Sequence, residues 1–223
     1  MDNPNKKVLF SNLLRDNVIF IILAGMVAIL SIFIPTFGTA NNIINILRQS
    51  SALTIIAMGQ YFVVLSGGID LSAGSNISFI TCLITGLMYF NGWPLLWALI
   101  FTLIVGIFIG VINGILVAYG NIQPFIVTLA TMIIVKGVAF IYSGGIPISG
   151  TPGAFEYFGR GFIGAVPFPV VLMLAVVGIC YVFSEHTVTG RNILYVGGNE
   201  SAAGLCGIDT KKVKLMVYII SGF

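Results

Sequence analysis

Charged side chains are scarce in this sequence. The 223 residues include 10 Lys and Arg, 7 Asp and Glu and one His, so that 8% of the chain is charged and 58% is hydrophobic. A soluble globular domain carries about 25% charged residues. The composition therefore excludes a soluble core and indicates an integral membrane protein. The net charge of +3 comes from a few positive residues that flank apolar segments, which gives no indication of nucleic-acid binding.

Metal sites and catalytic motifs are missing as well. The cysteines Cys82, Cys180 and Cys206 are scattered, and no two have the spacing of metal ligands. The one histidine, His186, stands at the end of an apolar run, where an interfacial residue is the better interpretation. No stretch matches a P-loop, a zinc-protease helix or a nucleophile elbow. We therefore expect no enzyme and no cofactor; uphill transport would depend on an ion gradient or a partner.

Apolar runs separated by polar turns predict an all-α, polytopic transmembrane protein with one domain over residues 1–223. Six complete spans are predicted, at Val18–Ile34, Ile43–Leu65, Asn76–Phe90, Leu95–Ala118, Phe125–Tyr142 and Val166–Ser184. A seventh begins at Val213 and stops after 11 residues. Because a bilayer requires ~20 residues, we expect a fragment cut within a helix.

Positive charge predicts the orientation of these spans. Lysine and arginine concentrate before the first span and in the polar loop 185–214, and this asymmetry places both on the cytoplasmic side. The residues concerned are Lys6, Lys7, Arg15, Arg191, Lys211, Lys212 and Lys214. The polar loop also contains a predicted short helix, Asn199–Leu205, with Asn199 as N-cap and Gly204 or Gly207 at its end. Such a helix suits docking onto a soluble partner, and a plain connector is the alternative.

Few polar residues lie within the spans, and those few are candidates for a transport path. Asp70 stands in a glycine-rich break, where it either lines the path or starts the following helix. Lys136 lies midway along the fifth span and is predicted to face the interior or a wet cavity. The amides Gln60, Asn76 and Asn113 either bind sugar hydroxyls or bond neighbouring helices.

Small residues mark one face of the fourth span. Gly106, Gly110 and Gly114 recur every four residues, a pattern that lets another helix approach closely. The partner of this face is open, and helices beyond the given sequence are one possibility.

Three segments together resemble the permease subunit of bacterial ribose/xylose-type ABC importers. They are GGIDLSAGS at Gly67–Ser75, NGILVAYGNIQPFIVTLATM at Asn113–Met132 and GRNILYVGGNESAAGLCGI at Gly190–Ile208. The resemblance covers nearly the whole chain in order. It implies a permease of about ten helices that works as a pair in the bacterial inner membrane. It further implies translocation of a monosaccharide, an ATPase partner in the cytoplasm and an extracytoplasmic sugar-binding protein.

The resemblance also makes the loop 185–214 the coupling loop that meets the ATPase. The residues expected to take part are Arg191, Gly198, Asn199, Glu200, Ala202, Ala203 and Gly207. Other readings stay open: a permease for another small solute of the same superfamily, such as a branched-chain amino acid or a nucleoside, a gradient-driven carrier, or a membrane scaffold.

Overall fold

The computed structural model describes residues 17–148 and 153–223, so Lys6, Lys7 and Arg15 lie outside the described residues. The chain divides into two compact units, Met1–Leu47 and Arg48–Phe223, which are described separately. The first unit contains α2 (Val18–Phe33) and the beginning of α3 (Ala40–Leu65). Helix α2 ends where Ile34 turns to extended backbone before Pro35, as proline requires of the residue that precedes it.

Helices make up most of the second unit, as the hydropathy pattern predicts. After the last part of α3, its long helices are α4 (Ala73–Tyr89), α5 (Leu95–Ala118), α6 (Pro124–Ser143), α8 (Phe168–His186) and α11 (Thr210–Gly222). Three shorter elements and a hairpin complete it: α7 (Gly153–Arg160), β1 (Phe162–Ile163), β2 (Val166–Pro167), α9 (Val188–Gly198) and α10 (Glu200–Leu205). The predicted bounds of α5 are confirmed. Proline stands in the first turn of α6 and of α8, where its missing backbone N–H breaks no hydrogen bond within the helix.

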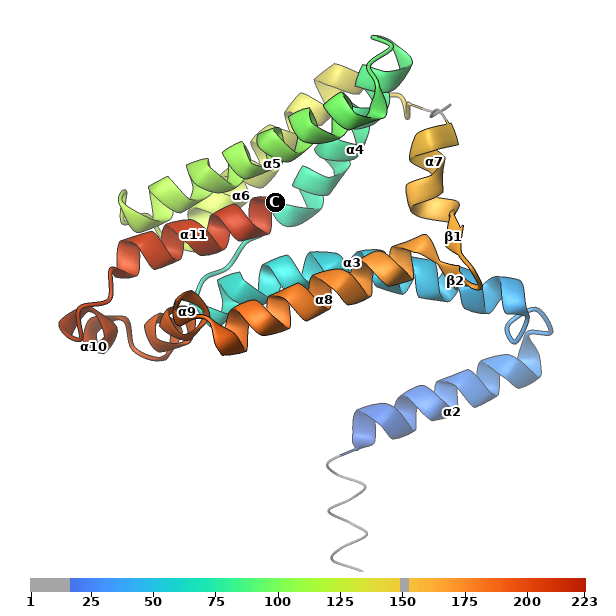
Figure 1. Cartoon of the computed structure of the whole chain (residues 1–223), viewed down its shortest axis with the longest axis horizontal. Coiled ribbons are helices and arrows are strands. Elements are labelled where there is room, and N and C mark those ends of the chain that lie inside the picture. Colours follow the sequence, from blue (N-terminus) through green and yellow to red (C-terminus); the bar gives the residue numbers. More distant parts are fainter. Residues whose placement is uncertain (1–16, 149–152) are drawn as a thin grey trace, which may run out of the picture. The chain divides into compact units, whose positions relative to one another are not determined.

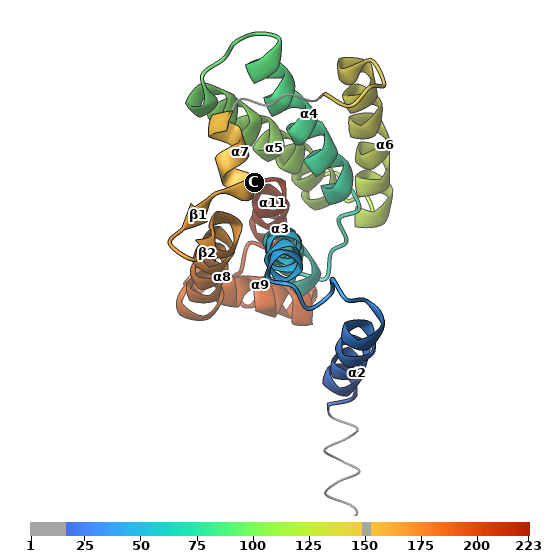
Figure 2. The same ribbon diagram turned by 90° about the vertical axis from the view of Figure 1, so that its right-hand side faces the viewer.

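Two groups of helices form the second unit. Helices α4, α5 and α6 pack on one another, and α11 lies along α5 (Figure 1). Figure 2 shows α11 between α5 and the end of α3, with α8 and α9 on the α3 side. One apolar core joins α3, α9, α10 and α11 around Phe62, Ile193 and Tyr218, and a second joins α4 to the start of α5.

Three helices among the described residues are long and apolar enough to cross a membrane: α5, α6 and α8. Helices α2 and α4 are apolar but shorter. The long apolar helices keep most of their surface exposed; α8 has no buried residue at all. Exposed apolar helices of this length are what a bilayer accommodates.

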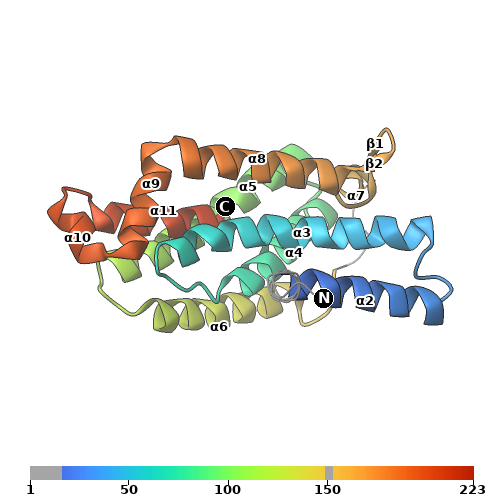
Figure 3. The ribbon, with the colours of Figure 1, turned by 90° about the horizontal axis from the view of Figure 1, so that it is seen from below.

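The polar connections of the second unit lie at opposite ends of its helices. Helix α10 is at one end, and α7 with the hairpin is at the other (Figures 1 and 3). The sequence pattern did not predict α7, α9 or the hairpin: α7 and β1 lie between the predicted spans, β2 lies at the start of the predicted sixth span, and α9 lies in the polar loop. Arg48 holds the hairpin end: its guanidinium donates to the carbonyl oxygen of Arg160 at 2.7 Å and lies over the Phe162 ring at 4.8 Å.

Candidate functional site

The chain breaks between α3 and α4, and Asp70 organises the break. Gly67 has a φ of +79°, a left-handed conformation that favours glycine, so the chain can leave α3 sharply. The buried Asp70 carboxylate then accepts three hydrogen bonds: from the Ser72 backbone N–H at 2.9 Å, from the Ser72 hydroxyl at 2.6 Å and from the Ser221 hydroxyl at 2.6 Å. Asp70 therefore fixes Ser72, the residue that precedes α4, and ties it to α11.

A second set of polar contacts converges on Ser72. Asn113, which is fully buried, donates from Nδ2 to the Ser72 hydroxyl at 3.0 Å, and the Thr131 hydroxyl donates to Asn113 Oδ1 at 2.6 Å. Asn76 Nδ2 also approaches the Ser72 hydroxyl, at 3.4 Å. Asn113 thus bonds the break to α5 and α6, which is the structural use of an amide in a membrane helix.

Helix α11 completes the network from the other side. Gln60 Nε2 donates to Ser221 Oγ at 3.3 Å, and the buried Tyr218 hydroxyl donates to the carbonyl oxygen of Ile69 at 3.2 Å. The sequence interpretation missed Ser72, Ser221 and Tyr218. Ser221 and Tyr218 are hydroxyl residues in an otherwise apolar run, and Ser72 lies two residues after Asp70 in the glycine-rich break; these positions were the available signal.

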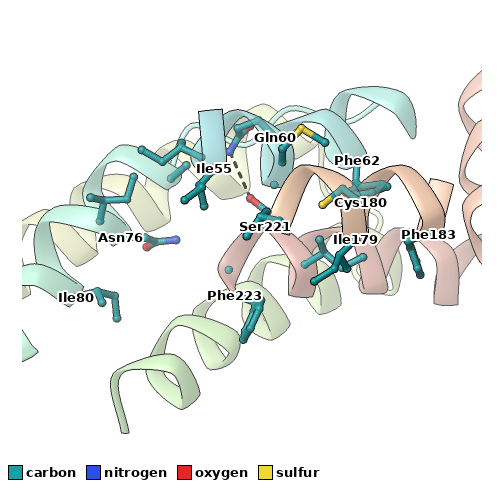
Figure 4. A pocket seen from close by; sticks show the side chains of 18 of the residues that line it. Ile55, Gln60, Phe62, Asn76, Ile80, Ile179, Cys180, Phe183, Ser221 and Phe223 are labelled. Atoms are coloured by element: carbon teal, nitrogen blue, oxygen red, sulfur yellow. Dashed lines mark hydrogen bonds between the residues drawn. The ribbon is translucent and has the colours of Figure 1, made fainter. Parts of the chain in front are cut away.

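A cavity of about 520 Å³ lies beside this network. Segments of α3, α4, α8 and α11 line it, and Figure 4 shows their side chains around the Gln60–Ser221 hydrogen bond. Most of the wall is apolar, from residues such as Ile80, Ile179 and Phe183, whereas Gln60 and Asn76 are polar. Of the predicted path residues, only these two line the cavity; Asp70 and Asn113 stand behind them.

Lys136 does not join this site. It lies on the exposed surface of α6, between the buried residues Val135 and Ala139, and it makes no ion pair within the described part of the chain. Lys136 therefore does not face the interior of the described chain, and its contact with a wet cavity stays a prediction. The hydropathy pattern predicts how far along the fifth span Lys136 lies. Which side of α6 packs on α4 is set by long-range contacts, and one sequence does not show them.

The three glycines of α5 lie against α11. A Cβ on Gly106 would stand 2.5 Å from the carbonyl oxygen of Gly222, and one on Gly114 would stand 3.0 Å from Leu215 Cα. A Cβ on Gly110 would overlap the Tyr218 carbonyl oxygen. The two backbones thus touch directly, and the neighbour of this face is inside the given sequence.

The polar loop 185–214 begins with the last two residues of α8 and then folds as α9, α10 and the start of α11. Asn199 caps α10, where its side-chain oxygen accepts from the Ala202 backbone N–H at 2.9 Å, and Gly207 closes the helix with a φ of +85°. The Glu200 carboxylate pairs with the Lys214 ammonium at 2.6 Å. Arg191, Gly198 and Ala202 are also exposed.

Ala203 departs from the expectation that it meets a partner. It is 4% exposed and packs into the chain's own core with Val196 and Val213, so it anchors α10 rather than faces outward. The residue that does face outward is Leu205, which is 91% exposed. The sequence interpretation did not single it out, because the helical phase of a six-residue segment is fixed only by its packing.

At the end of α10, Asp209 caps α11 by accepting from the Lys212 backbone N–H at 3.1 Å. This bond, and the Lys212 side chain at 3.0 Å, hold the pKa of the Asp209 carboxyl below its ordinary value. The same carboxylate raises the pKa of the Lys212 ammonium.

Residues 42–223 match the model of a protein family described as branched-chain amino acid transport system / permease component. The chain belongs to this permease family. It is 39% identical to the ribose import permease RbsC of Bacillus subtilis over 224 residues, which cover 100% of this chain and 69% of that protein. It is 34% identical to the galactose/methyl galactoside import permease MglC of Salmonella typhimurium, covering 100% of this chain and 71% of that protein.

A third relative, the D-allose transport system permease AlsC of Escherichia coli, is 38% identical over 91% of this chain and 63% of its own length. No solved structure matches the chain. The resemblance drawn from the three sequence segments is thereby confirmed at the level of the family.

Proposed function

We propose that the chain is the membrane-spanning translocation subunit of an ATP-driven importer of a ribose-like monosaccharide. The observation that carries the proposal is its identity to the ribose import permease, 39% over the whole chain. The galactose/methyl galactoside and D-allose permeases are similar at 34% and 38%. A branched-chain amino acid is the second candidate solute, because the family description names it.

The permease would work with three partners. An ATPase subunit would supply the energy, an extracytoplasmic binding protein would deliver the sugar, and a second copy of the permease would complete the path. Helix α10 is the proposed contact with the ATPase. It carries Leu205, whose burial on docking would contribute about 1.5–3 kcal/mol. Exposed Glu200 lies close by, at a rim where a surface charge pair adds only ~0–1 kcal/mol.

The proposed topology has a cytoplasmic N-terminus, six complete spans and the start of a seventh. It rests on the lysine and arginine asymmetry, and the opposite placement of α7 and α10 supports it. Cysteines at Gly159 and Ser201, both exposed, test it in a cysteine-free background. A membrane-impermeant reagent added to intact cells should label the cysteine at 159 only. Labelling at 201 with protection at 159 would reverse the topology.

Uptake into membrane vesicles tests the function. With the partner ATPase and binding protein present, ribose uptake should require ATP and should survive collapse of the ion gradients. Leu205→Ser should lower the affinity for the ATPase by about 10- to 100-fold and reduce uptake in proportion. Ile163→Ser is the matched control, because Ile163 is an exposed apolar residue of the hairpin at the opposite end.

Two results would refute the proposal. Uptake that follows a proton or sodium gradient without ATP would indicate a secondary carrier. ATP-dependent uptake of leucine but not of ribose would favour the second candidate solute. If Leu205→Ser binds the ATPase as tightly as Ile163→Ser does, the contact lies elsewhere on the permease.

A further inference from the structure

Helix α11 carries polar side chains on one face, and each of them bonds another segment of the chain. These residues, spaced four and three apart and so one turn from each other, are Lys214, Tyr218 and Ser221. The Lys214 ammonium contacts both oxygens of the Glu200 carboxylate in α10 at 2.6 Å. The other two donate to the α3–α4 break, at the Ile69 carbonyl oxygen (3.2 Å) and the Asp70 carboxylate (2.6 Å). One face of α11 therefore joins the polar loop to the break, as the path of α11 away from α10 in Figure 1 allows.

Tyr218 fixes the break and α5 to the same turn of α11. Its side chain is 1% exposed, and a Cβ on Gly68 of the break would stand 2.9 Å from its hydroxyl oxygen. Its own carbonyl oxygen lies against Gly110 of α5. The Thr128 hydroxyl also approaches the Ile69 oxygen, at 3.4 Å, but donates at 2.8 Å within α6. Because backbone atoms make these contacts, no rotamer change relieves them, and a shift of α11 must displace the break.

A second cavity, of about 310 Å³, lies between α10 and the break. It is lined by Glu200 and Lys214 of the ion pair, by Tyr218 and by residues 66–68 of the break. Closely packed interiors resist small displacements, because the side chains have no free volume to enter. The cavity therefore leaves the break room to move beside α10 and α11.

We propose that α11 transmits movements of α10 to the α3–α4 break, with Lys214 and Tyr218 as positioning residues at the two ends of this linkage. Helix α10 is the proposed contact with the ATPase, so the inference rests on the proposed function. A nucleotide-driven shift of α10 passes through Lys214 into α11 and through Tyr218 into the break. Neither residue has to touch the solute.

The linkage is tested first in the full-length permease alone. Ile69→Cys, in a cysteine-free background, places a thiol in the break at a side chain that is 49% exposed, and it keeps the carbonyl that Tyr218 bonds. Lys214→Gln should raise the rate at which N-ethylmaleimide alkylates this thiol by about 2- to 5-fold. Lys212→Gln is the matched control, because Lys212 pairs with Asp209 and not with α10. It should leave the rate unchanged.

The second test uses the permease assembled with its ATPase and binding protein in vesicles. Tyr218→Phe removes the hydroxyl and keeps the buried ring. The change in alkylation at position 69 that ATP causes should be about 2- to 10-fold smaller in this variant. Ribose imported per ATP hydrolysed should fall by a similar factor, while the rate of hydrolysis stays the same. Tyr61→Phe is the matched control, because the Tyr61 hydroxyl is 3.4 Å from Ser184 of α8 and makes no contact with α11 in the described chain.

The outcomes separate this inference from the proposed function. Equal alkylation in Lys214→Gln and Lys212→Gln would overturn the linkage. So would a Tyr218→Phe variant that loses hydrolysis and import in the same proportion, since that result indicates a structural role only. If ribose uptake requires ATP but both variants match their controls, the function stands and the inference is wrong. If Lys214→Gln alters the break but no uptake depends on ATP, the linkage stands and the function is wrong.

Discussion

Replacing Gly110 with alanine should force α5 and α11 apart. The new Cβ would overlap the Tyr218 carbonyl oxygen and would lie 3.1 Å from Ile219 Cα, and both are backbone atoms that no rotamer change can move. The same close approach is found at Gly106, where an added Cβ would stand 2.5 Å from the Gly222 carbonyl oxygen. Comfortable contacts begin near ~3.5 Å, so α11 must retreat by about 1 Å along this seam.

The cost follows from the loss of close packing. Overpacking of this kind destabilises by about 1–3 kcal/mol. In a chain of this size each kcal/mol corresponds to about 2–4 °C, so the melting temperature in detergent should fall by about 2–12 °C. Gly110→Leu should be more severe, since a larger side chain has no open direction toward α11.

Gly137→Ala on α6 is the matched control. A Cβ at Gly137 meets nothing within 4 Å, and alanine favours the helix over glycine, so its melting temperature should stay the same or rise. The assay is thermal unfolding of the full-length protein in detergent, followed by loss of the monodisperse species on size exclusion. If Gly110→Ala and Gly137→Ala melt at the same temperature, the close α5–α11 contact is not present in the protein.

Three further outcomes follow from local contacts. Asp70→Ala leaves three donors without their acceptor and should lower the melting temperature by several degrees, at about 1–3 kcal/mol. Gly197→Ala should destabilise, because its Cβ would overlap the Leu65 carbonyl oxygen, whereas Gly198→Ala meets open space and should be neutral in the same melting assay. The pKa of the Asp209 carboxyl is lowered by Lys212, so its stabilisation is complete at neutral pH and is lost as the pH falls through the folded-state value. Melting curves between pH 7 and 3 should therefore show a smaller fall in melting temperature for Asp209→Asn than for the unchanged protein. If the two fall equally, Asp209 does not contribute to the pH dependence of stability.

The sequence by itself determined the class of the protein and the positions of its long helices. Hydropathy and charge are local properties, and the bilayer makes them decisive, because every backbone group in an apolar span must bond within its helix. This is why α5 begins and ends where predicted, at Leu95 and Ala118. The Asn199 cap of α10 also followed from the sequence, since a cap is a contact between neighbours in the chain.

Only the tertiary structure decided which partners these elements meet. That the glycine face of α5 lies on α11, and that Ser221 bonds Asp70 across 151 residues of chain, are long-range facts with no local signature. The same holds for burial: Ala203 faces inward and Lys136 outward because of how α10 and α6 pack. Composition thus predicts the membrane environment and the helices, whereas the hydrogen bonds that tie the α3–α4 break to α5, α6 and α11 depend on packing alone.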